Sequence, residues 1–438
     1  MLALTLLSYL GMKTSWLVGW SLAVALTACA SEDFVDDPGD DTWLDGKADA
    51  ASGVNIAATH LDVDLAAKTA VATIELEKAG SVALEAGGLT IKKVTDSRGN
   101  RRFSVVGGKL RVSNVRGALV IEYGFAQHSN ADGLLPGGST VMWPYHCGNL
   151  MPCHSQPADG TTFSLNIDGV PSGKQAIYPE TIDAESPPYM LAWAVGSYTK
   201  QELGTTPGGT TISTYWLPQG KTAALAGTKN LVKAFEWLET KLGPYTFGRE
   251  VASVSVVWGE GMYGGMEHHP FFHVAKDAMD DEVTHVHEAA HGWFGDGVRI
   301  RCWEDFVLSE GTTSYLAARA LSQVAPTMET KIWADYKEEL DAAIAEGGAP
   351  AWPTGCNQID ILKDKLFTNL PYMQGAFFYK DVAAQVGAAK LDAVISKFYM
   401  TYKNKAAGMQ QMIDLIKAET GFDPTPIATA RLRKKFPS

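Results

Sequence analysis

The chain has 438 residues, of which 46% are hydrophobic, 20% charged and 10% aromatic, and it carries a formal net charge of −12. This composition is typical of a globular protein with about two or three domains. The acidic balance argues against nucleic acid as a partner, because phosphate binding needs a basic face. No internal run is apolar over the roughly 18 residues that a membrane-spanning helix needs.

Residues 1–28 are predicted to be a secretory signal peptide. An apolar stretch at 16–28 follows Lys13 and is too short to span a membrane. It ends in Leu26-Thr27-Ala28-Cys29, which resembles a bacterial lipoprotein signal. That resemblance implies an exported protein, periplasmic or at the cell surface, anchored to a bacterial membrane by a lipid on Cys29. A plain signal peptide with a cysteine at this place by chance is the alternative.

Residues 29–51 are predicted to be an acidic linker, because they carry eight acidic residues against Lys47 and such a composition cannot build a core. Residues 52–202 are predicted to form an N-terminal antiparallel β domain. Apolar and polar residues alternate at 61–65 and 74–77, and turns containing Gly and Asn separate such stretches. We therefore expect a sandwich or saddle of short strands.

Residues 203–438 are predicted to form a second, mainly helical domain, which makes the fold α+β and multidomain. Glycines and prolines between 204 and 218 mark the crossing into this domain. An apolar stripe with helical spacing follows at 231–242 and stops at Gly243-Pro244. Helical periodicity is expected again from about 329 to the end of the chain.

The second domain contains His287-Glu288-Ala289-Ala290-His291. On a helix, positions i and i+4 share a face, so His287 and His291 can direct imidazole nitrogens at one point. Glu288 follows His287 by about 100° of helical turn and lies beside that point. Two imidazoles and a further carboxylate make a zinc site with an open fourth position, at which Glu288 would serve as general base toward a zinc-activated water.

The carboxylate that completes this site is predicted to be Glu310, nineteen residues after His291. A second helix is expected to begin here, with Ser309 as its N-cap and apolar residues at helical spacing until Pro326. Glu310 would then lie on the first turn of a helix packed against the first. The sequence therefore predicts one Zn2+ per chain, held by His287, His291 and Glu310.

These motifs together resemble the M1 aminopeptidases, zinc enzymes with a thermolysin-like catalytic domain. The likeness covers the spacing from His287 to Glu310. It continues upstream in Gly264-Gly265-Met266-Glu267-His268 and downstream in Pro371-Tyr372-Met373-Gln374-Gly375. The three motifs stand in the order that the family has, and the resemblance spans roughly residues 52 to 420.

The resemblance implies a role for each matching residue. Tyr372 would be catalytic, because a phenol can donate a hydrogen bond to the developing oxyanion. Gly264, Gly265 and Met266 would let the substrate backbone approach a strand closely. Glu267 would pair with the free α-amino group of a peptide, so that cleavage releases its first residue. A core tyrosine and a turn glutamate between bending glycines are the structural alternatives.

Three departures from the family bear on specificity. His268 replaces the usual Asn after Glu267, and Trp143 stands where the family has a glutamine that also holds the substrate amine. Larger family members continue into a helical C-terminal domain that covers the active site, so a more open site is expected here. The missing cover and the missing glutamine keep a zinc endopeptidase with a relaxed need for a free N-terminus as one alternative. A non-catalytic peptide-binding protein on the same fold is an alternative of another class.

After Cys29, an even set of cysteines remains, which permits disulfides in an exported protein. Cys147–Cys153 would close a small loop, and Cys302–Cys356 would tie the zinc region to a later loop. Sequence alone does not decide the pairing, and buried free thiols are the alternative. The remaining histidines near the motif are not added to the zinc site; they are His268, His269, His273 and His285. The basic group at 431–435 is given no role.

Overall fold

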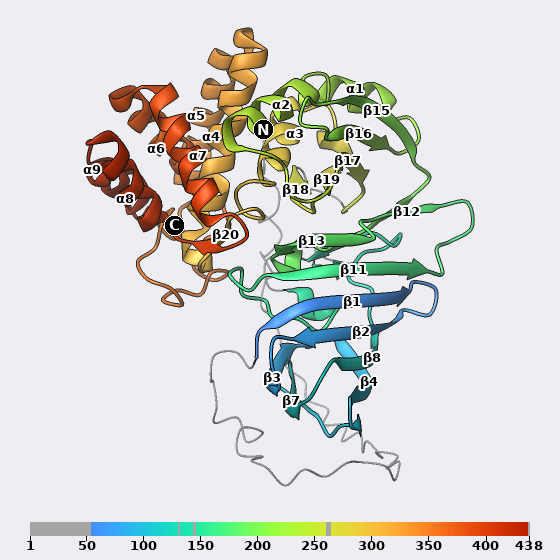
Figure 1. Ribbon diagram of the computed structural model, residues 1–438. Coiled ribbons are helices and arrows are strands. Elements are labelled where there is room, and N and C mark those ends of the chain that lie inside the picture. The colour runs from blue at the N-terminus through green and yellow to red at the C-terminus, as the bar shows by residue number, and fades with distance from the viewer. Residues whose placement is uncertain (1–53, 130–131, 143–145, 260–263, 437–438) are drawn as a thin grey trace, which may run out of the picture.

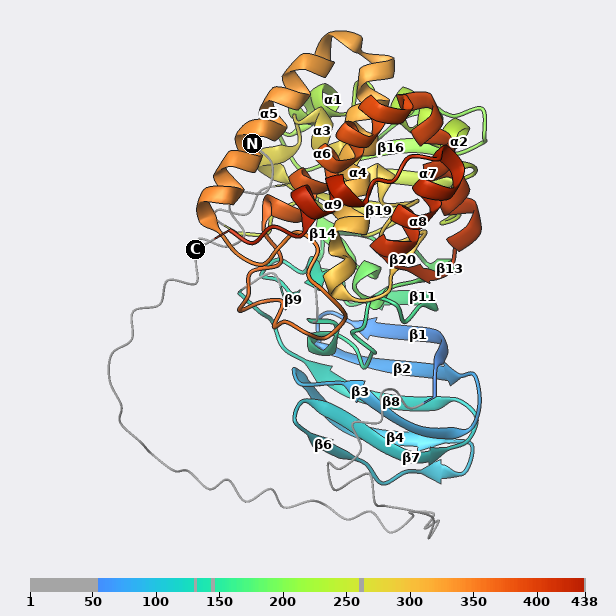
Figure 2. The same ribbon diagram turned by 90° about the vertical axis from the view of Figure 1, so that its left-hand side faces the viewer.

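The computed structural model describes residues 54–129, 132–142, 146–259 and 264–436 (Figure 1). The predicted signal peptide and acidic linker, with Cys29, therefore lie outside the described residues, and so does Trp143. None of the helices in the described ranges is both long and apolar enough to cross a membrane. Strands form one part of the molecule, and helices with a smaller sheet form the other (Figures 1 and 2).

The β part contains a seven-stranded sheet in the order β13-β11-β1-β2-β8-β4-β5. Its strands are β1 (Ile56–Asp64), β2 (Thr69–Leu76), β4 (Leu89–Asp96), β5 (Gly99–Asn100), β8 (Leu119–Phe125), β11 (Thr161–Asp168) and β13 (Thr181–Ser186). Every pair in this sheet is antiparallel except β1 with β11. Strand β8 alternates buried and half-buried residues, as expected for a sheet with one face on a core.

A three-stranded sheet in the order β3-β7-β6 contributes to the same core. Its strands are β3 (Gly80–Glu85), β6 (Ser104–Val106) and β7 (Lys109–Val115). Two short pairs complete this part: β9 (Asp132–Leu134) with β10 (Thr140–Met142), and β12 (Gln175–Ile177) with β14 (Ala194–Gly196). The expectation of an N-terminal part built from short strands therefore agrees with the structure, except that β1 and β11 pair in parallel.

A five-stranded sheet in the order β15-β16-β17-β19-β18 leads into the helical part. Its strands are β15 (Thr199–Thr205), β16 (Thr211–Trp216), β17 (Glu250–Val256), β18 (Gly265–Met266) and β19 (Phe271–Ala275). The three central strands run parallel and the two outer pairs are antiparallel. The predicted domain boundary between 202 and 203 falls inside β15.

Nine α-helices occur in the described residues. They are α1 (Lys221–Gly227), α2 (Leu231–Leu242), α3 (Glu282–Ala290), α4 (Phe306–Val324), α5 (Glu329–Glu346), α6 (Asn369–Val386), α7 (Ala388–Tyr402), α8 (Met409–Thr420) and α9 (Thr425–Leu432). The helical periodicity expected from 329 onward is interrupted, because the segment 347–368 between α5 and α6 is irregular.

Helix α4 packs closely against α6 at two glycines. A Cβ added at Gly311 would lie 2.6 Å from the Cα of Gly375, and one added at Gly375 would lie 2.4 Å from the Cα of Gly311. Because real side chains do not tolerate such contacts, both positions require glycine for this approach. The contact brings Glu310 on α4 and Tyr372 on α6 toward the same region.

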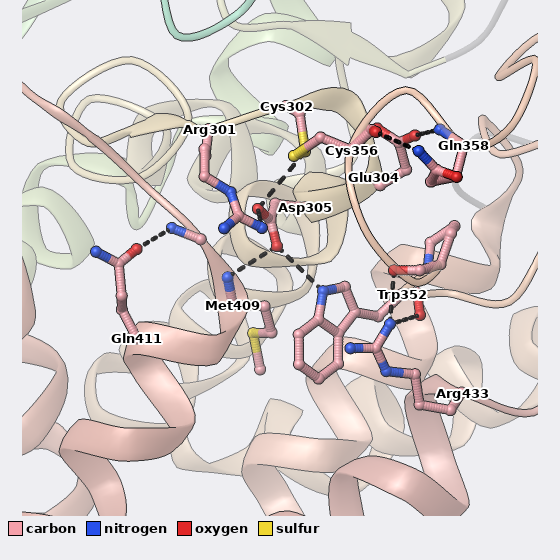
Figure 3. The surroundings of a disulfide bond; sticks show 12 residues. Arg301, Cys302, Glu304, Asp305, Trp352, Cys356, Gln358, Met409, Gln411 and Arg433 are labelled. Carbon is pink, nitrogen blue, oxygen red and sulfur yellow. Dashed lines mark hydrogen bonds and ion pairs between the residues drawn. A yellow bond between two sulfur atoms is a disulfide. The ribbon is translucent and has the colours of Figure 1, made fainter.

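Both cysteine pairs considered from the sequence form disulfides, Cys147–Cys153 and Cys302–Cys356. The second joins Cys302, which lies shortly before α4, to Cys356 in the irregular segment 347–368 (Figure 3). The backbone N–H of Gln358 donates to Glu304 Oε1 at 2.8 Å, and Trp352 Nε1 donates to Asp305 Oδ1 at 3.1 Å. This segment is therefore fixed to the start of α4 before it leads into α6.

Candidate metal centre and active site

Helix α3 carries the two predicted histidine ligands. Asp281 caps its N-terminus, accepting hydrogen bonds from Val283 N at 3.0 Å and Thr284 Oγ1 at 2.9 Å. The helix is buried from end to end and stops at Ala290, so that His291 is its C-cap residue. The i, i+4 spacing places the rings of His287 and His291 with centroids 4.8 Å apart.

Helix α4 supplies Glu310 but begins earlier than predicted. It starts at Phe306, so Glu310 lies in its second turn rather than its first, and Ser309 is an interior residue instead of the N-cap. The hydroxyl of Ser309 instead lies 3.3 Å from His291 Nδ1. The predicted N-cap was wrong because tertiary contacts of Asp305, which accepts from Trp352 and from Met409 N, set the start of the helix.

The three predicted ligand atoms converge on one point. Glu310 Oε2 lies 3.1 Å from His287 Nε2 and 3.2 Å from His291 Nε2, and the two nitrogens are 3.1 Å apart. Ligands about 2.0–2.1 Å from a tetrahedral metal ion would lie roughly 3.3 Å from one another. The triangle therefore fits one such ion with almost no rearrangement.

The other nitrogens of the two imidazoles are engaged by the chain. His291 Nδ1 donates to the carbonyl oxygen of Phe294 at 2.9 Å, and His287 Nδ1 lies 3.3 Å from Ser314 Oγ. A ring that donates through Nδ1 presents a lone pair at Nε2. This arrangement directs two lone pairs and a carboxylate at the same place, as the outer partners of metal-binding histidines do.

The charges of the cluster are consistent with this arrangement. Burial opposes ionisation of Glu310, but the charge of His291 and the hydrogen bonds from both histidines lower the pKa of that carboxyl to about 2. Burial also disfavours the charged form of His291, yet the facing carboxylates of Glu310 and Glu267 raise its pKa well above the usual value. The point between Glu310 and the two imidazoles therefore favours a positively charged species.

Glu288 lies beside the triangle rather than in it. Burial raises the pKa of its carboxyl well above the usual range, an effect that the charge of His291 opposes. Gly265 packs on this side chain, since a Cβ at that position would lie 2.4 Å from Glu288 Cγ. Glycine at 265 thus leaves the space that Glu288 occupies.

Glu267 follows strand β18 directly and is 4% exposed. Its carboxylate, that of Glu288 and a ring nitrogen of His291 all lie within 4.8 Å of one another. Glu267 Oε1 is buried and has no hydrogen-bond partner among the residues that the structure describes. Gly264, with φ at 100°, precedes the strand, and β18 pairs with β19 through Gly265 and Met266.

Tyr372 lies in the first turn of α6 and is half-buried. Its ring stacks on that of His287, with centroids 5.7 Å apart and planes inclined by 23°. Burial raises the pKa of the phenol well above its usual value, and the surrounding carboxylates of Glu310, Glu267 and Glu288 raise it further. Tyr372 is therefore a protonated hydrogen-bond donor next to the triangle.

All nine residues predicted for the site line one cavity. They are Gly264, Gly265, Met266, Glu267, His287, Glu288, His291, Glu310 and Tyr372. Sequence reasoning missed the wall contributed by α5 and by the approach to α6, which is formed by Tyr336, Glu339, Phe367, Thr368 and Asn369. One signal was present: Glu339 lies on the same helical face as the buried Ile332, Tyr336 and Ala343.

The neighbouring histidines are placed away from the triangle. His285 Nε2 lies 3.0 Å from the carbonyl oxygen of Met279. His269 contacts Tyr245 Oη and the carbonyl oxygen of Glu288, both at 2.7 Å, and the rings of His268 and His273 meet edge to face. Among the described residues, none of these four histidines has a ring nitrogen close enough to His287, His291 and Glu310 to share a metal ion with them.

Residues 263–430 match the model of the peptidase family M1 domain. The chain carries an M1 peptidase domain. The family predicted from the motifs is thereby confirmed.

Similar proteins include leucine aminopeptidase 2 of Chaetomium globosum, 24% identical over 60% of this chain and 46% of its own length. Leucine aminopeptidase 2 of Pyricularia oryzae is 26% identical over 61% of this chain and 47% of its own length. The chain thus spans about half the length of the curated relatives it matches.

The fold is shared with solved structures of an M1 zinc metallopeptidase from Deinococcus radiodurans. One has a TM-score of 0.74 at 17% identity, covering 88% of this chain and 95% of that one. Another, a mutant bound to a Tyr-Ser-Ala substrate, has a TM-score of 0.72 at 16% identity. This likeness confirms the predicted α+β fold, with its β-rich N-terminal part and mainly helical remainder.

Proposed function

We propose that this protein is a zinc-dependent aminopeptidase that releases N-terminal residues from peptides. The observation that carries the proposal is the buried carboxylate of Glu267, which lines the cavity beside the triangle with its Oε1 unpaired among the described residues. Such an oxygen is a ready partner for the α-ammonium group of a peptide. The names of the relatives support this assignment, because they are aminopeptidases.

Zinc would be held by His287, His291 and Glu310, whose donor set and spacing suit it. When bound, zinc supplies Lewis-acid polarisation of a carbonyl group and a lowered pKa for water. The outer contacts of the two imidazoles, to Phe294 O and Ser314 Oγ, hold the rings in place for it.

Three residues of the chain have the other roles in catalysis and substrate binding. Glu288 accepts the proton of the attacking water and passes it to the leaving amine, a role suited to a buried carboxylate whose pKa is raised. Tyr372 donates a hydrogen bond to the oxygen on which negative charge develops. Glu267 holds the α-amino group, which sets the scissile bond one residue from the N-terminus.

A pair of substrates tests the need for a free amine. The zinc-loaded full chain is assayed with leucine p-nitroanilide and its N-acetylated form, with metal content measured before and after treatment with a chelator. We expect cleavage of the free amine only, lost with the metal and restored by zinc. Equal cleavage of both forms would favour the endopeptidase alternative. Failure to cleave any peptide, with zinc bound, would favour a non-catalytic binding protein.

We also propose that the protein is exported and anchored to a bacterial membrane by lipid on Cys29. The sequence Leu26-Thr27-Ala28-Cys29 supports this proposal, and so do the two disulfides, which are rare in reducing compartments. Expression in a bacterial host, fractionation and mass spectrometry provide the test. We expect a lipidated N-terminal Cys29 in the membrane fraction and release of the Cys29→Ser variant. An unmodified Cys29 would contradict the anchor.

A further inference from the structure

The cavity extends from the metal triangle in two directions. On the side of His291 lies Glu267, whose carboxylate, with that of Glu288, is within 4.8 Å of a His291 nitrogen. On the side of His287 lie residues one helical turn from the ligands, Val283 on α3 and Ser314 on α4. Because the proposed function places the peptide amine at Glu267, the chain beyond the scissile bond runs toward the side of His287.

That second side is closed by helix α5 and the start of α6. Tyr336 Oη donates to the carbonyl oxygen of Ser314 at 3.1 Å, which attaches α5 to the wall beside His287. Glu339, one turn further along α5, is 3% exposed and lines the same cavity. Asn369 Nδ2 lies 3.5 Å from Glu339 Oε2, so the carboxylate is held at the junction of α5 and α6.

The cavity is strongly acidic. Its described lining includes four glutamates, namely Glu267, Glu288, Glu310 and Glu339, and neither lysine nor arginine. Glu310 faces the two histidines and Glu267 lies at the amine end, so each has its own positive partner in the proposed function. Glu339 stands apart from both, at the end where the released portion of the peptide would lie.

We propose that Glu339 determines specificity for the residue that follows the cleaved bond, and that this residue is basic. A lysine or arginine side chain in that position would bring its positive charge to the carboxylate of Glu339 in a site shielded from water, where charge pairing is strong. An acidic side chain would meet like charge there and be rejected. This inference rests on the proposed function, because Glu267 defines the direction of the substrate.

A tripeptide panel tests the proposal with the zinc-loaded full chain. Ala-Lys-Ala, Ala-Ala-Ala and Ala-Glu-Ala vary the second residue, and Lys-Ala-Ala moves the charge to the first. We expect kcat/KM to be at least about tenfold higher for Ala-Lys-Ala than for Ala-Glu-Ala. The proposal is overturned if the second residue has no effect, or if a basic first residue is the preferred feature instead.

Variants then attribute the preference to one carboxylate. In Glu339→Gln the ratio of Ala-Lys-Ala to Ala-Glu-Ala should fall toward one, and Glu339→Asp, which keeps the charge, should retain part of it. Glu338→Gln changes the exposed neighbour on the same helix and should keep the ratio of the unaltered protein. An undiminished ratio in Glu339→Gln would overturn the assignment. Thermal unfolding of each variant identifies any that fails to fold.

Binding provides a readout that is independent of turnover. Titration calorimetry with zinc-loaded Glu288→Gln protein should show tighter binding of Ala-Lys-Ala than of Ala-Glu-Ala, a difference that the added Glu339→Gln change removes. Equal binding of both peptides would count against the proposal. Hydrolysis of all four tripeptides at equal rates would defeat this inference alone, whereas hydrolysis of none by the zinc-loaded protein would defeat the proposed function.

Discussion

Two groups of buried histidines lie within one core and differ in what their nitrogens face. The metal histidines, His287 and His291, point Nε2 atoms at each other and at Glu310. The strand histidines are His268 and His269, between strands β18 and β19, and His273, within β19; each is 2% exposed or less. Burial is thus common to both groups and does not distinguish a metal site from a packed core.

The electrostatic surroundings separate His291 from the strand histidines. Burial lowers the pKa of His269 and of His273 to about 3, and it lowers that of His268 well below the usual value, so these rings are neutral. Burial also lowers the pKa of His287, an effect that its hydrogen bond to Glu310 opposes, whereas the carboxylates around His291 raise the pKa of that ring well above the usual value. A metal site is therefore recognised by several lone pairs and a carboxylate converging on one point, and a histidine-rich sequence alone does not reveal this.

The largest effect is expected where the base is removed without disturbing the metal triangle. Glu288→Gln should lower kcat by a factor of about 100 to 10,000, because an amide cannot take the proton of water. Zinc content should stay at one per chain, since Glu288 is outside the triangle. Steady-state kinetics with leucine p-nitroanilide and elemental analysis test both points. Undiminished turnover would contradict the role of Glu288, and loss of zinc would contradict its position outside the metal sphere.

A second experiment contrasts the two groups directly through metal affinity. Glu310→Gln removes the carboxylate that faces both metal histidines and should weaken zinc binding at least about 100-fold. His273→Gln, a change among the strand histidines, should leave zinc affinity within about twofold, because none of the clusters of potential metal ligands among the described residues includes this ring. Competition with a chromophoric chelator measures both. Comparable losses in the two variants would erase the distinction between the groups.

Local spacing in the sequence accounts for much of the site. The i, i+4 rule places His287 and His291 on one face before any fold is known. Glu310 could be named because the motif, its spacing and the resemblance to a family agree. The start of α4 could not, because Asp305 is held by Trp352 and Met409, which are distant in sequence.

Long-range features escaped prediction for the same reason. The parallel pairing of β1 with β11 joins segments separated by most of the β part, and no local pattern specifies it. The irregular segment 347–368 takes its course from the disulfide at Cys356 and from contacts with Glu304 and Asp305. Glu339 became a cavity residue only through the packing of α5 against α6.

The smallest effect concerns the strand histidines and acts on stability. The folded-state pKa of His273, about 3, lies below the usual 6.5, so between these values the unfolded chain binds more protons. The stability linked to this neutral ring is complete above pH 6.5 and is lost as the pH falls toward 3. The folded protein should therefore become steadily less resistant to denaturant in mild acid.

The variant His273→Gln lacks the imidazole that binds a proton when the chain unfolds in this pH range, so its stability should depend less on pH. In metal-free protein below about pH 6, the slope of the unfolding free energy against pH should decrease by up to about 1.4 kcal/mol per pH unit. The slope is the informative quantity, because a glutamine in the core shifts the absolute stability at every pH. Urea unfolding of both proteins is measured in the same chelating buffers. His287 and His291 then contribute equally to both slopes, so their contribution cancels in the difference. An unchanged slope would mean that His273 is protonated in the folded state, and its contrast with His291 would then rest on geometry alone.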